Sequence, residues 1–370
     1  ALPEVDLFLG ASESGRLAQE LAQRGVIGGD PIAMHPGVRI YMGDLPHVRY
    51  LKISEGCDHG CAFCAIPLMR GKHRSFSRDE VVREAQLLEL QGAKELNLVA
   101  QDLAHYGRDI RDGVRLPELL ESLVAETSVP WIRMLYLYST GITPRLLEVV
   151  AKENRILPYL DMPMQHASDA VLASMRRPER KRTIRDRVAR FREAVPGVAI
   201  RTTCIVGFPG ETESDFDELM EFLEETQFDR VGAFTYSPQE GTRAAEMADD
   251  VPDPVKRERL ERLQELQRSI TAEKYESRFA TCAQFIVDRI TDGVSVGRLP
   301  WQADDVDGVT FLDEVHPPGT LAEVAVGEVV DDYDFRASMV HVISAEPAPK
   351  IVPARRSLPM AAITVGSYGR

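Results

Sequence analysis

From residue 50 onward the chain alternates short apolar runs with longer stretches whose apolar residues recur every three or four positions. The short runs predict buried strands, and the longer stretches predict amphipathic helices. Strands that alternate with helices build a parallel sheet through right-handed crossovers, so six of them indicate an open (β/α)6 partial barrel over residues 46–253. The predicted strands are Tyr50–Ser54, Glu95–Ala100, Trp131–Leu137, Leu157–Met162, Val198–Val206 and Arg230–Tyr236.

The pattern changes after residue 253. Residues 254–276 place Leu260, Leu263, Leu266 and Ile270 on one side of a charged stretch, which predicts a connecting helix. From 277 to 345 the period falls to two, with Gly- and Pro-rich turns, which predicts a small all-β barrel of the OB type. Its predicted strands are Ala283–Ile290, Val294–Leu299, Val309–Phe311, Leu321–Val330 and Met339–Ile343.

The two ends of the chain follow neither pattern. Val5–Leu9 predicts a short strand, and Ser14 is placed to cap a helix that runs to about Arg24. One strand and one helix cannot bury a core, so residues 1–45 are expected to be the end of a preceding domain and a linker. Residues 346–370 are rich in proline and have no apolar period, which predicts a disordered tail.

Charge and cysteine content narrow the function classes. The chain has 58 Asp and Glu against 44 Lys and Arg, a net charge of −14, which favours a basic protein partner or a small substrate over nucleic acid. Five cysteines, three of them within one loop, do not suit a disulfide framework. No apolar run reaches the ~20 residues needed to cross a bilayer. We therefore expect a cytoplasmic protein.

Three of the cysteines directly follow the first predicted strand. Cys57, Cys61 and Cys64 are spaced so that one loop can direct three thiols at one metal centre. A structural zinc site uses four ligands, usually in two separated pairs, and the chain has no second Cys pair, so an iron–sulfur cluster fits this spacing better. Two alternatives stay open at this point: three buried structural thiols, or a zinc site completed by His59 or His73.

Other polar and glycine residues follow the later strands of the same predicted sheet. Gln101 ends the second strand, Gln165 and His166 follow the fourth, and a Gly-Phe-Pro-Gly turn at 207–210 follows the fifth. In a parallel barrel the functional residues lie at the carboxyl ends of the strands, so we expect these groups on the same rim as the cysteines. His166 has two interpretations, a proton relay or a residue that stabilises its turn.

These motifs together resemble the methylthiotransferase branch of the radical S-adenosylmethionine (SAM) enzymes. The all-β end is similar to that family's TRAM domain. The match extends over residues 1–345. The stretches that carry it are Glu55–Cys64 with Pro67, Arg70-Gly71 and Arg74-Ser75, Gln101-Asp102 with Tyr106-Gly107, Pro163–Ser168 with Met175-Arg176-Arg177, Ile205–Glu213, and Tyr236-Ser237-Pro238 with Gly241-Thr242.

The resemblance implies a role for each matching residue. Cys57, Cys61 and Cys64 would hold a [4Fe-4S] cluster whose open iron binds SAM, and Phe63 would pack against the adenine. Contacts to the methionyl and ribose parts are expected from Gln101, Gln165, Arg201, Gly207 and Gly210. The family's additional N-terminal domain holds a second cluster on three cysteines. Residues 1–45 resemble only its end and contain no Cys, so we expect one cluster in this chain and a second in the complete enzyme.

Two substrates occur within this branch: an aspartate β-carbon in a small-subunit ribosomal protein, and an adenosine in tRNA. Residues 277–345 contain four arginines against twelve Asp and Glu, a net charge of −8, which repels phosphate and attracts a basic protein. We therefore predict the ribosomal protein as the substrate, with a flavodoxin-type protein as the electron donor. An alternative of another class is a non-catalytic, metal-bearing module that binds RNA or protein.

Overall fold

The computed structural model describes residues 16–25, 45–331 and 333–345. The strand expected at Val5–Leu9 and the tail expected at 346–370 lie outside the described residues. Helix α1 (Leu17–Gln23) falls within the stretch expected to be helical after Ser14.

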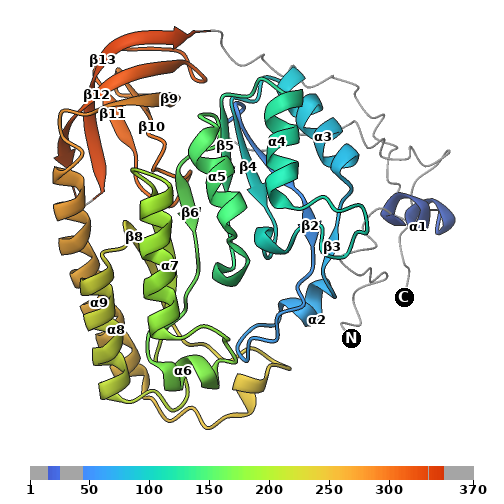
Figure 1. The fold of residues 1–370 in the computed structure, drawn as a ribbon, viewed down its shortest axis with the longest axis vertical. Helices are drawn as coiled ribbons and strands as arrows, with labels where there is room; N and C mark the ends of the chain where they lie inside the picture. Colours follow the sequence, from blue (N-terminus) through green and yellow to red (C-terminus); the bar gives the residue numbers. More distant parts are fainter. Residues whose placement is uncertain (1–15, 26–44, 332, 346–370) are drawn as a thin grey trace, which may run out of the picture.

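The six expected strands of the partial barrel all form, and all pair in parallel (Figure 1). They make two three-stranded sheets, ordered β1-β4-β5 and β6-β7-β8. Backbone hydrogen bonds bridge the two sheets, from the Leu157 amide to the Ile132 carbonyl (2.9 Å) and from the Leu137 amide to the Asp161 carbonyl (2.8 Å). The expected open (β/α)6 barrel is therefore confirmed. Its strands are β1 (Val48–Lys52), β4 (Glu95–Val99), β5 (Trp131–Met134), β6 (Tyr159–Asp161), β7 (Ala199–Val206) and β8 (Arg230–Thr235).

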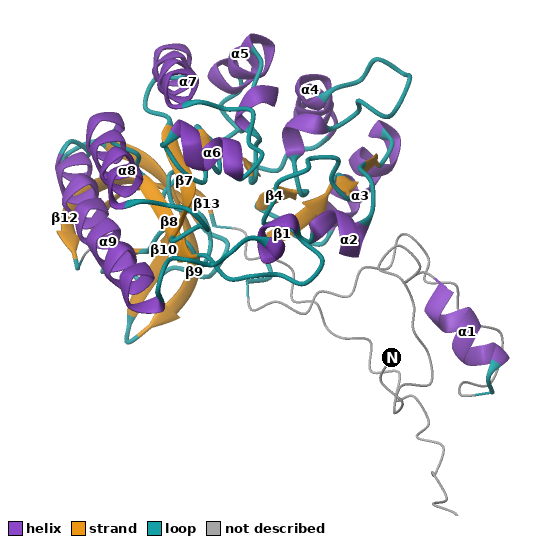
Figure 2. Ribbon diagram, turned by 90° about the horizontal axis from the view of Figure 1, so that it is seen from below, coloured by secondary structure: helices purple, strands orange, loops and turns teal. Residues whose placement is uncertain are grey.

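Helices cover the outer face of these strands (Figure 2). Their starts are set by local sequence: Ser77 and Glu80 form a capping box at α3, as do Thr212 and Asp215 at α8. No helix among the described residues is both long and apolar enough to span a bilayer. The bounds are α2 (Ile66–Arg70), α3 (Arg78–Leu90), α4 (Leu116–Glu126), α5 (Pro144–Lys152), α6 (Asp169–Ser174), α7 (Lys181–Ala194), α8 (Glu213–Thr226) and α9 (Asp253–Glu276).

The chain after α9 forms a closed five-stranded barrel, as its two-residue period predicted. The strand order is β10-β11-β13-β12-β9. The last strand begins at Asp334, five residues before the expected Met339, because it pairs with β11 on one side and β12 on the other. The strands are β9 (Cys282–Thr291), β10 (Val294–Arg298), β11 (Thr310–Leu312), β12 (Leu321–Val330) and β13 (Asp334–Ser344).

This small barrel packs against the amino ends of the parallel strands. Trp131, Tyr159 and Ala199, the first residues of β5, β6 and β7, form one apolar cluster with Ile286 and Leu321 of the small barrel. Figure 1 shows the small barrel at one end of the strands and the loop between β2 and α2 at the other. The carboxyl ends of the strands are therefore left free for a site.

A buried network of charges joins the two barrels. Glu95, at the start of β4, accepts a hydrogen bond from Arg133 Nε (2.7 Å) and pairs with Arg298 Nη2 of the small barrel (2.6 Å). Arg298 also binds Asp288, which is hydrogen-bonded to His47 (2.9 Å). Burial alone would raise the pKa of Glu95, but the charges of Arg298 and Arg133 outweigh it and hold that pKa below its usual range.

The Glu95 network predicts a large loss of stability when its carboxylate is removed. Glu95→Gln leaves two buried guanidinium groups without their shared charge, which costs about 3–5 kcal/mol. Urea unfolding followed by tryptophan fluorescence measures this loss, since Trp131 and Trp301, the chain's two tryptophans, both lie at the junction.

The matched control is Glu121→Gln, which removes a carboxylate from an exposed ion pair with Arg145. We expect it to change the unfolding midpoint much less than Glu95→Gln. Equal midpoints for the two variants would contradict the structural role given to Glu95.

Candidate metal centre

The three cysteines lie in a loop whose two ends are held together by hydrogen bonds. A two-stranded antiparallel pair, β2 (Ser54–Glu55) and β3 (Arg74–Ser75), brackets the loop, and the Cys57 amide donates to the Gly71 carbonyl (3.2 Å). Gly56 has a φ of +81°, and a Cβ there would lie 2.2 Å from the Lys72 carbonyl oxygen. Glycine is therefore required at the point where the strand turns into the loop.

The loop is also tied to two other segments at the carboxyl ends of the strands. The Ala62 amide donates to the Met175 carbonyl (2.9 Å), in the turn after α6, and the Ala62 carbonyl accepts from the Ala244 amide (2.9 Å), in the segment after β8. Backbone hydrogen bonds thus hold the middle of the cysteine loop in place from both sides.

All three thiols line one cavity of about 190 Å³. The cavity lies past the ends of β4, β5 and β6 and beside Thr203 of β7, at the side expected for a parallel barrel. Its lining consists of Cys57, His59, Cys61, Phe63, Cys64, Gln101, Tyr136, Tyr138, Pro163, Gln165, Arg177 and Thr203.

This donor set fits an iron–sulfur cluster. Three thiols from one loop line the cavity and its lining offers no fourth cysteine, so a four-iron cluster held there would keep one coordination position for another ligand. Burial raises the pKa of the Cys57 thiol to about 11 and raises the pKa of Cys64 as well. Thiolates at these positions therefore need a nearby positive charge, such as a metal, at neutral pH.

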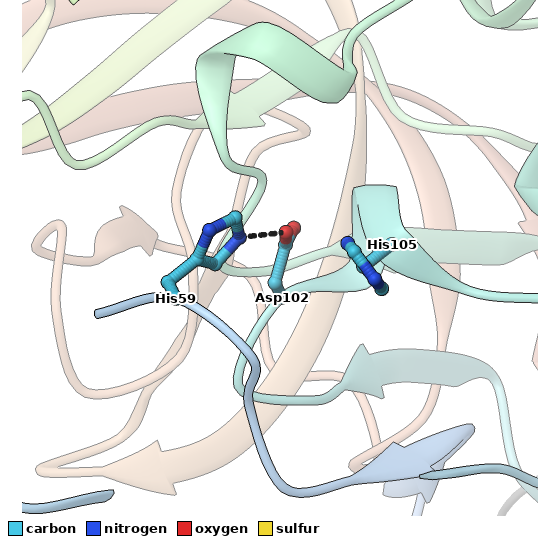
Figure 3. A group of neighbouring side chains, drawn as sticks. All are labelled: His59, Asp102 and His105. Carbon is cyan, nitrogen blue, oxygen red and sulfur yellow. Dashed lines mark hydrogen bonds and ion pairs between the residues drawn. The ribbon is translucent and has the colours of Figure 1, made fainter. Parts of the chain in front are cut away.

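His59 lies on the same wall, but its ring is engaged elsewhere. Figure 3 shows His59 directed at Asp102, with His105 on the other side of that carboxylate. The His59 Nε2 to Asp102 Oδ2 distance is 2.8 Å, and the ligand atoms of the three side chains lie within 4.8 Å of one another. His73 instead binds the Ser75 hydroxyl (3.0 Å). Both histidines considered as a fourth zinc ligand thus bind other side chains.

Three of the residues expected to contact SAM line the cavity with the cysteines: Phe63, Gln101 and Gln165. Gln165 has a φ of +75°, an unusual backbone conformation for a residue other than glycine. Two backbone hydrogen bonds hold it there, from its amide to the Thr203 carbonyl and from the Ile205 amide to its own carbonyl, each 2.8 Å. Strained backbone of this kind is concentrated at functional sites.

The structure does not bring the other three expected contacts to this cavity. Arg201 donates to Asp161 (2.8 Å) and faces Asp307 of the small barrel, because its position on β7 lies nearer the start of the strand. Gly207 packs against α9, where a Cβ would lie 2.3 Å from Lys256 Cγ. Gly210 lines a separate cavity of about 440 Å³.

His166 stabilises its turn. Its Nδ1 accepts a hydrogen bond from the Ser168 amide (3.0 Å), and the side chain is fully buried. Burial lowers the pKa of the ring to about 3, so it stays neutral at physiological pH. His166 does not line the cysteine cavity, and its Nε2 lies 3.6 Å from the buried Glu211 carboxylate, on the side away from the Ser168 amide.

The cavity residues that sequence reasoning missed include Tyr136, Tyr138 and Arg177. The two tyrosines follow β5 in an apolar Leu-Tyr-Leu-Tyr run that reads as buried strand. In the structure Tyr136 has a φ of +64° and is 50% exposed, so the strand ends before it. Arg177 lies in a motif that the resemblance included, but its sequence position does not reveal its contact with the cysteine loop.

The described geometry agrees with the comparisons to known proteins. Residues 51–223 match the family model of the Radical SAM superfamily. The ribosomal protein uS12 methylthiotransferase RimO of Anaeromyxobacter sp. (strain Fw109-5) is 43% identical over 366 residues, which cover 97% of this chain and 76% of that protein. RimO of Moorella thermoacetica is 42% identical over 342 residues, covering 90% of this chain and 78% of that protein.

Among solved structures, coproporphyrinogen III oxidase (HemN) from Escherichia coli, described as a radical SAM enzyme, matches with a TM-score of 0.48. The two sequences are 13% identical, and the match covers 81% of this chain and 70% of that one. Both RimO proteins are more than 40% identical to this chain, and the matches cover about three quarters of their length. This similarity shows the family. The chain belongs to the RimO family of ribosomal protein uS12 methylthiotransferases, within the radical SAM superfamily.

Proposed function

We propose that this chain holds one [4Fe-4S] cluster on Cys57, Cys61 and Cys64, binds SAM beside it, and cleaves SAM reductively for the methylthiolation of an aspartate β-carbon in ribosomal protein uS12. The observation that carries the proposal is that three cysteine side chains, and no fourth among the described residues, line one cavity at the carboxyl ends of the strands. The activity and the substrate follow the curated relatives, which are named as uS12 methylthiotransferases.

The chain's own residues would position the reactants and exclude water. When bound, the cluster and SAM supply the radical chemistry that removes hydrogen from an unactivated C–H bond. Phe63 offers an apolar surface for the adenine, while Gln101 and Gln165 offer amide groups to the polar parts of SAM. Tyr136, half exposed at the same cavity, is placed where the substrate would enter.

The acidic small barrel would attract a basic ribosomal protein from a distance. Its twelve carboxylates against four arginines create a field that speeds the approach of a cationic partner. The small barrel packs on the amino ends of the strands, and the cysteines follow the carboxyl ends, about 20 Å away by strand length. The proposed role of this charge is therefore steering and orientation, not contact with the reacting aspartate.

The proposed reaction also needs an electron donor and a reducing compartment. Reduction of the cluster needs a one-electron donor, for which we propose a flavodoxin-type protein. A ribosomal substrate and an oxygen-sensitive cluster both suit the reducing cytoplasm, where we place the protein.

The cluster assignment predicts the metal content. Protein prepared without oxygen is expected to be brown and to contain four irons and four sulfides per chain. Cys57→Ser, Cys61→Ser and Cys64→Ser should each lose most of the iron, because each removes one of three ligands. Cys282→Ser, at an exposed thiol outside the cavity, should keep it. Zinc in place of iron in the unaltered protein would refute the assignment.

The SAM site predicts a measurable role for Gln165. With dithionite the protein should release 5′-deoxyadenosine from SAM, which a pure binding module would not do. Gln165→Asn tolerates the same backbone but withdraws the amide by one methylene, so we expect SAM binding to weaken about threefold to tenfold, as for one lost hydrogen bond. Gln227→Asn is the matched control, since Gln227 also has a left-handed backbone (φ +54°) but lies at the end of α8. Equal SAM affinities for the two variants would remove Gln165 from the site.

The assignment of uS12 as substrate predicts that this chain binds uS12 and tRNA with different affinities. Ribosomal protein uS12 should bind more tightly than tRNA at both low and moderate salt, because the small barrel repels phosphate. Titration of both ligands under the same conditions measures this. Tighter binding of tRNA at both salt concentrations would support the tRNA adenosine enzyme instead.

Charge steering by the small barrel predicts a change in association rate. The substitutions Asp292→Asn, Glu314→Gln and Asp331→Asn together remove three negative charges from the small barrel. They should slow uS12 association about threefold to tenfold at low salt and make the association rate less dependent on salt. All three side chains are exposed, and Asn suits the left-handed backbone of 292 and 331. The control changes Asp186→Asn, Glu224→Gln and Glu261→Gln, which alters net charge equally on the barrel helices. Equal slowing by both sets would show that net charge matters and the small barrel does not.

A further inference from the structure

Arg177 is a buried guanidinium that faces one of the cluster cysteines. It lies in the turn between α6 and α7 and is 4% exposed. Its Nη1 is 3.8 Å from the Cys61 sulfur and within hydrogen-bonding range of it. Its Nη2 donates to the Pro163 carbonyl (2.7 Å) and to Glu179 Oε1 (3.2 Å). One edge of the guanidinium thus faces the thiol, and the other is anchored to the protein.

Aromatic stacking fixes the plane of this guanidinium. The Arg177 side chain lies over the Tyr138 ring, with its central carbon 4.0 Å from the ring centroid. Tyr138 in turn stacks on His59, with centroids 3.9 Å apart and an interplanar angle of 11°. His59 is held by Asp102. The stack therefore runs from the Asp102 carboxylate, after β4, to the Arg177 guanidinium beside Cys61. It restricts the motion of that guanidinium.

The preceding residue makes Arg177 point inward. Arg176 has a left-handed backbone (φ +59°), and its own side chain is exposed and lies over Gly60 of the cysteine loop. The Met175 carbonyl, one residue earlier, accepts the Ala62 amide of that loop. Two successive arginines thus reach the same loop, one across its exposed surface and one from the protein interior.

The effect on the cluster depends on which charged group lies nearer to the Cys61 sulfur. Arg177 presents Nη1 to the Cys61 sulfur, while the buried Glu179 carboxylate binds Nη2. Adding one electron to a thiolate-bound cluster adds one negative charge, which a fixed cation beside a sulfur ligand stabilises. Glu179 partly cancels that cation, so the two side chains act on the added electron with opposite signs.

Resting on the proposed function, we propose that Arg177 is a positioning residue that raises the reduction potential of the cluster through the Cys61 sulfur, with Glu179 as its opposing partner. Arg177 would make the cluster easier to reduce by a biological donor, and Glu179 would limit that effect. No bond forms or breaks in this step: one electron enters from the donor, and the arginine and the carboxylate keep their charges.

The test is a spectroelectrochemical titration of the cluster in the full chain, without SAM. Arg177→Gln removes the cation, so at a fixed applied potential the ratio of reduced to oxidised cluster should fall about tenfold, a shift of about 59 mV for a one-electron couple. Glu179→Gln removes the opposing charge and should raise the same ratio. Arg177→Lys keeps the charge and should retain most of the unaltered value.

Arg176→Gln is the matched control, because it removes a neighbouring positive charge that is exposed and screened by water. We expect it to leave the ratio nearly unchanged. A ratio that is unmoved in Arg177→Gln, or that moves in the same direction in Arg177→Gln and Glu179→Gln, would overturn the electrostatic role.

Iron content separates this result from a failure of the proposed function. Unaltered protein without iron would remove the cluster and this proposal together, whereas a four-iron protein with unmoved potentials would remove only the role of Arg177. If Arg177→Gln does not retain iron, the comparison of Arg177→Lys with Glu179→Gln decides the question. Equal potentials for those two variants would then overturn the proposal.

Discussion

The shared Glu95 carboxylate determines how the rest of the molecule is arranged. It lies at the first residue of β4, is completely buried, and binds Arg133 of the parallel sheet and Arg298 of the small barrel. A charge in such a place is stable only when its partners are present, so this contact specifies where the small barrel sits more than it adds stability. The small barrel thus covers the amino ends of the strands, and the cavity lined by the cysteines lies at their carboxyl ends.

At the carboxyl ends of the strands, three thiols are held in a fixed arrangement on a short loop. Gly56 permits the entry turn, the β2–β3 pair closes the base, and Ala62 is hydrogen-bonded on both its amide and its carbonyl. The stacked side chains His59, Tyr138 and Arg177 then supply a rigid polar wall. A loop supported in this way needs little reorganisation when it takes up a metal centre, which is what preorganisation at a cofactor site requires.

The separation of the two ends also shapes how the proposed substrate would be recognised. The small barrel and the loop that carries the cysteines lie at opposite ends of the same strands (Figure 1). Long-range attraction and local chemistry are therefore carried by different parts of the chain. Screening by salt weakens the field of the small barrel over that distance, so recognition near the cysteines would rest on groups at the cavity itself, where Tyr136 is half exposed.

The sequence alone determined the order of strands and helices, the closed small barrel and the cysteine loop, because each depends on local periodicity and spacing. It also placed Gln101 and Gln165 correctly on the rim, since a residue that ends a parallel strand must lie there. It could not decide between neighbours a few positions apart: Arg201 was expected to contact SAM but donates to Asp161, and neither Tyr138 nor Arg177 was expected at the site. Only tertiary packing brings residues 59, 102, 138 and 177 together, because side-chain direction at the end of a strand depends on contacts between segments far apart in the chain.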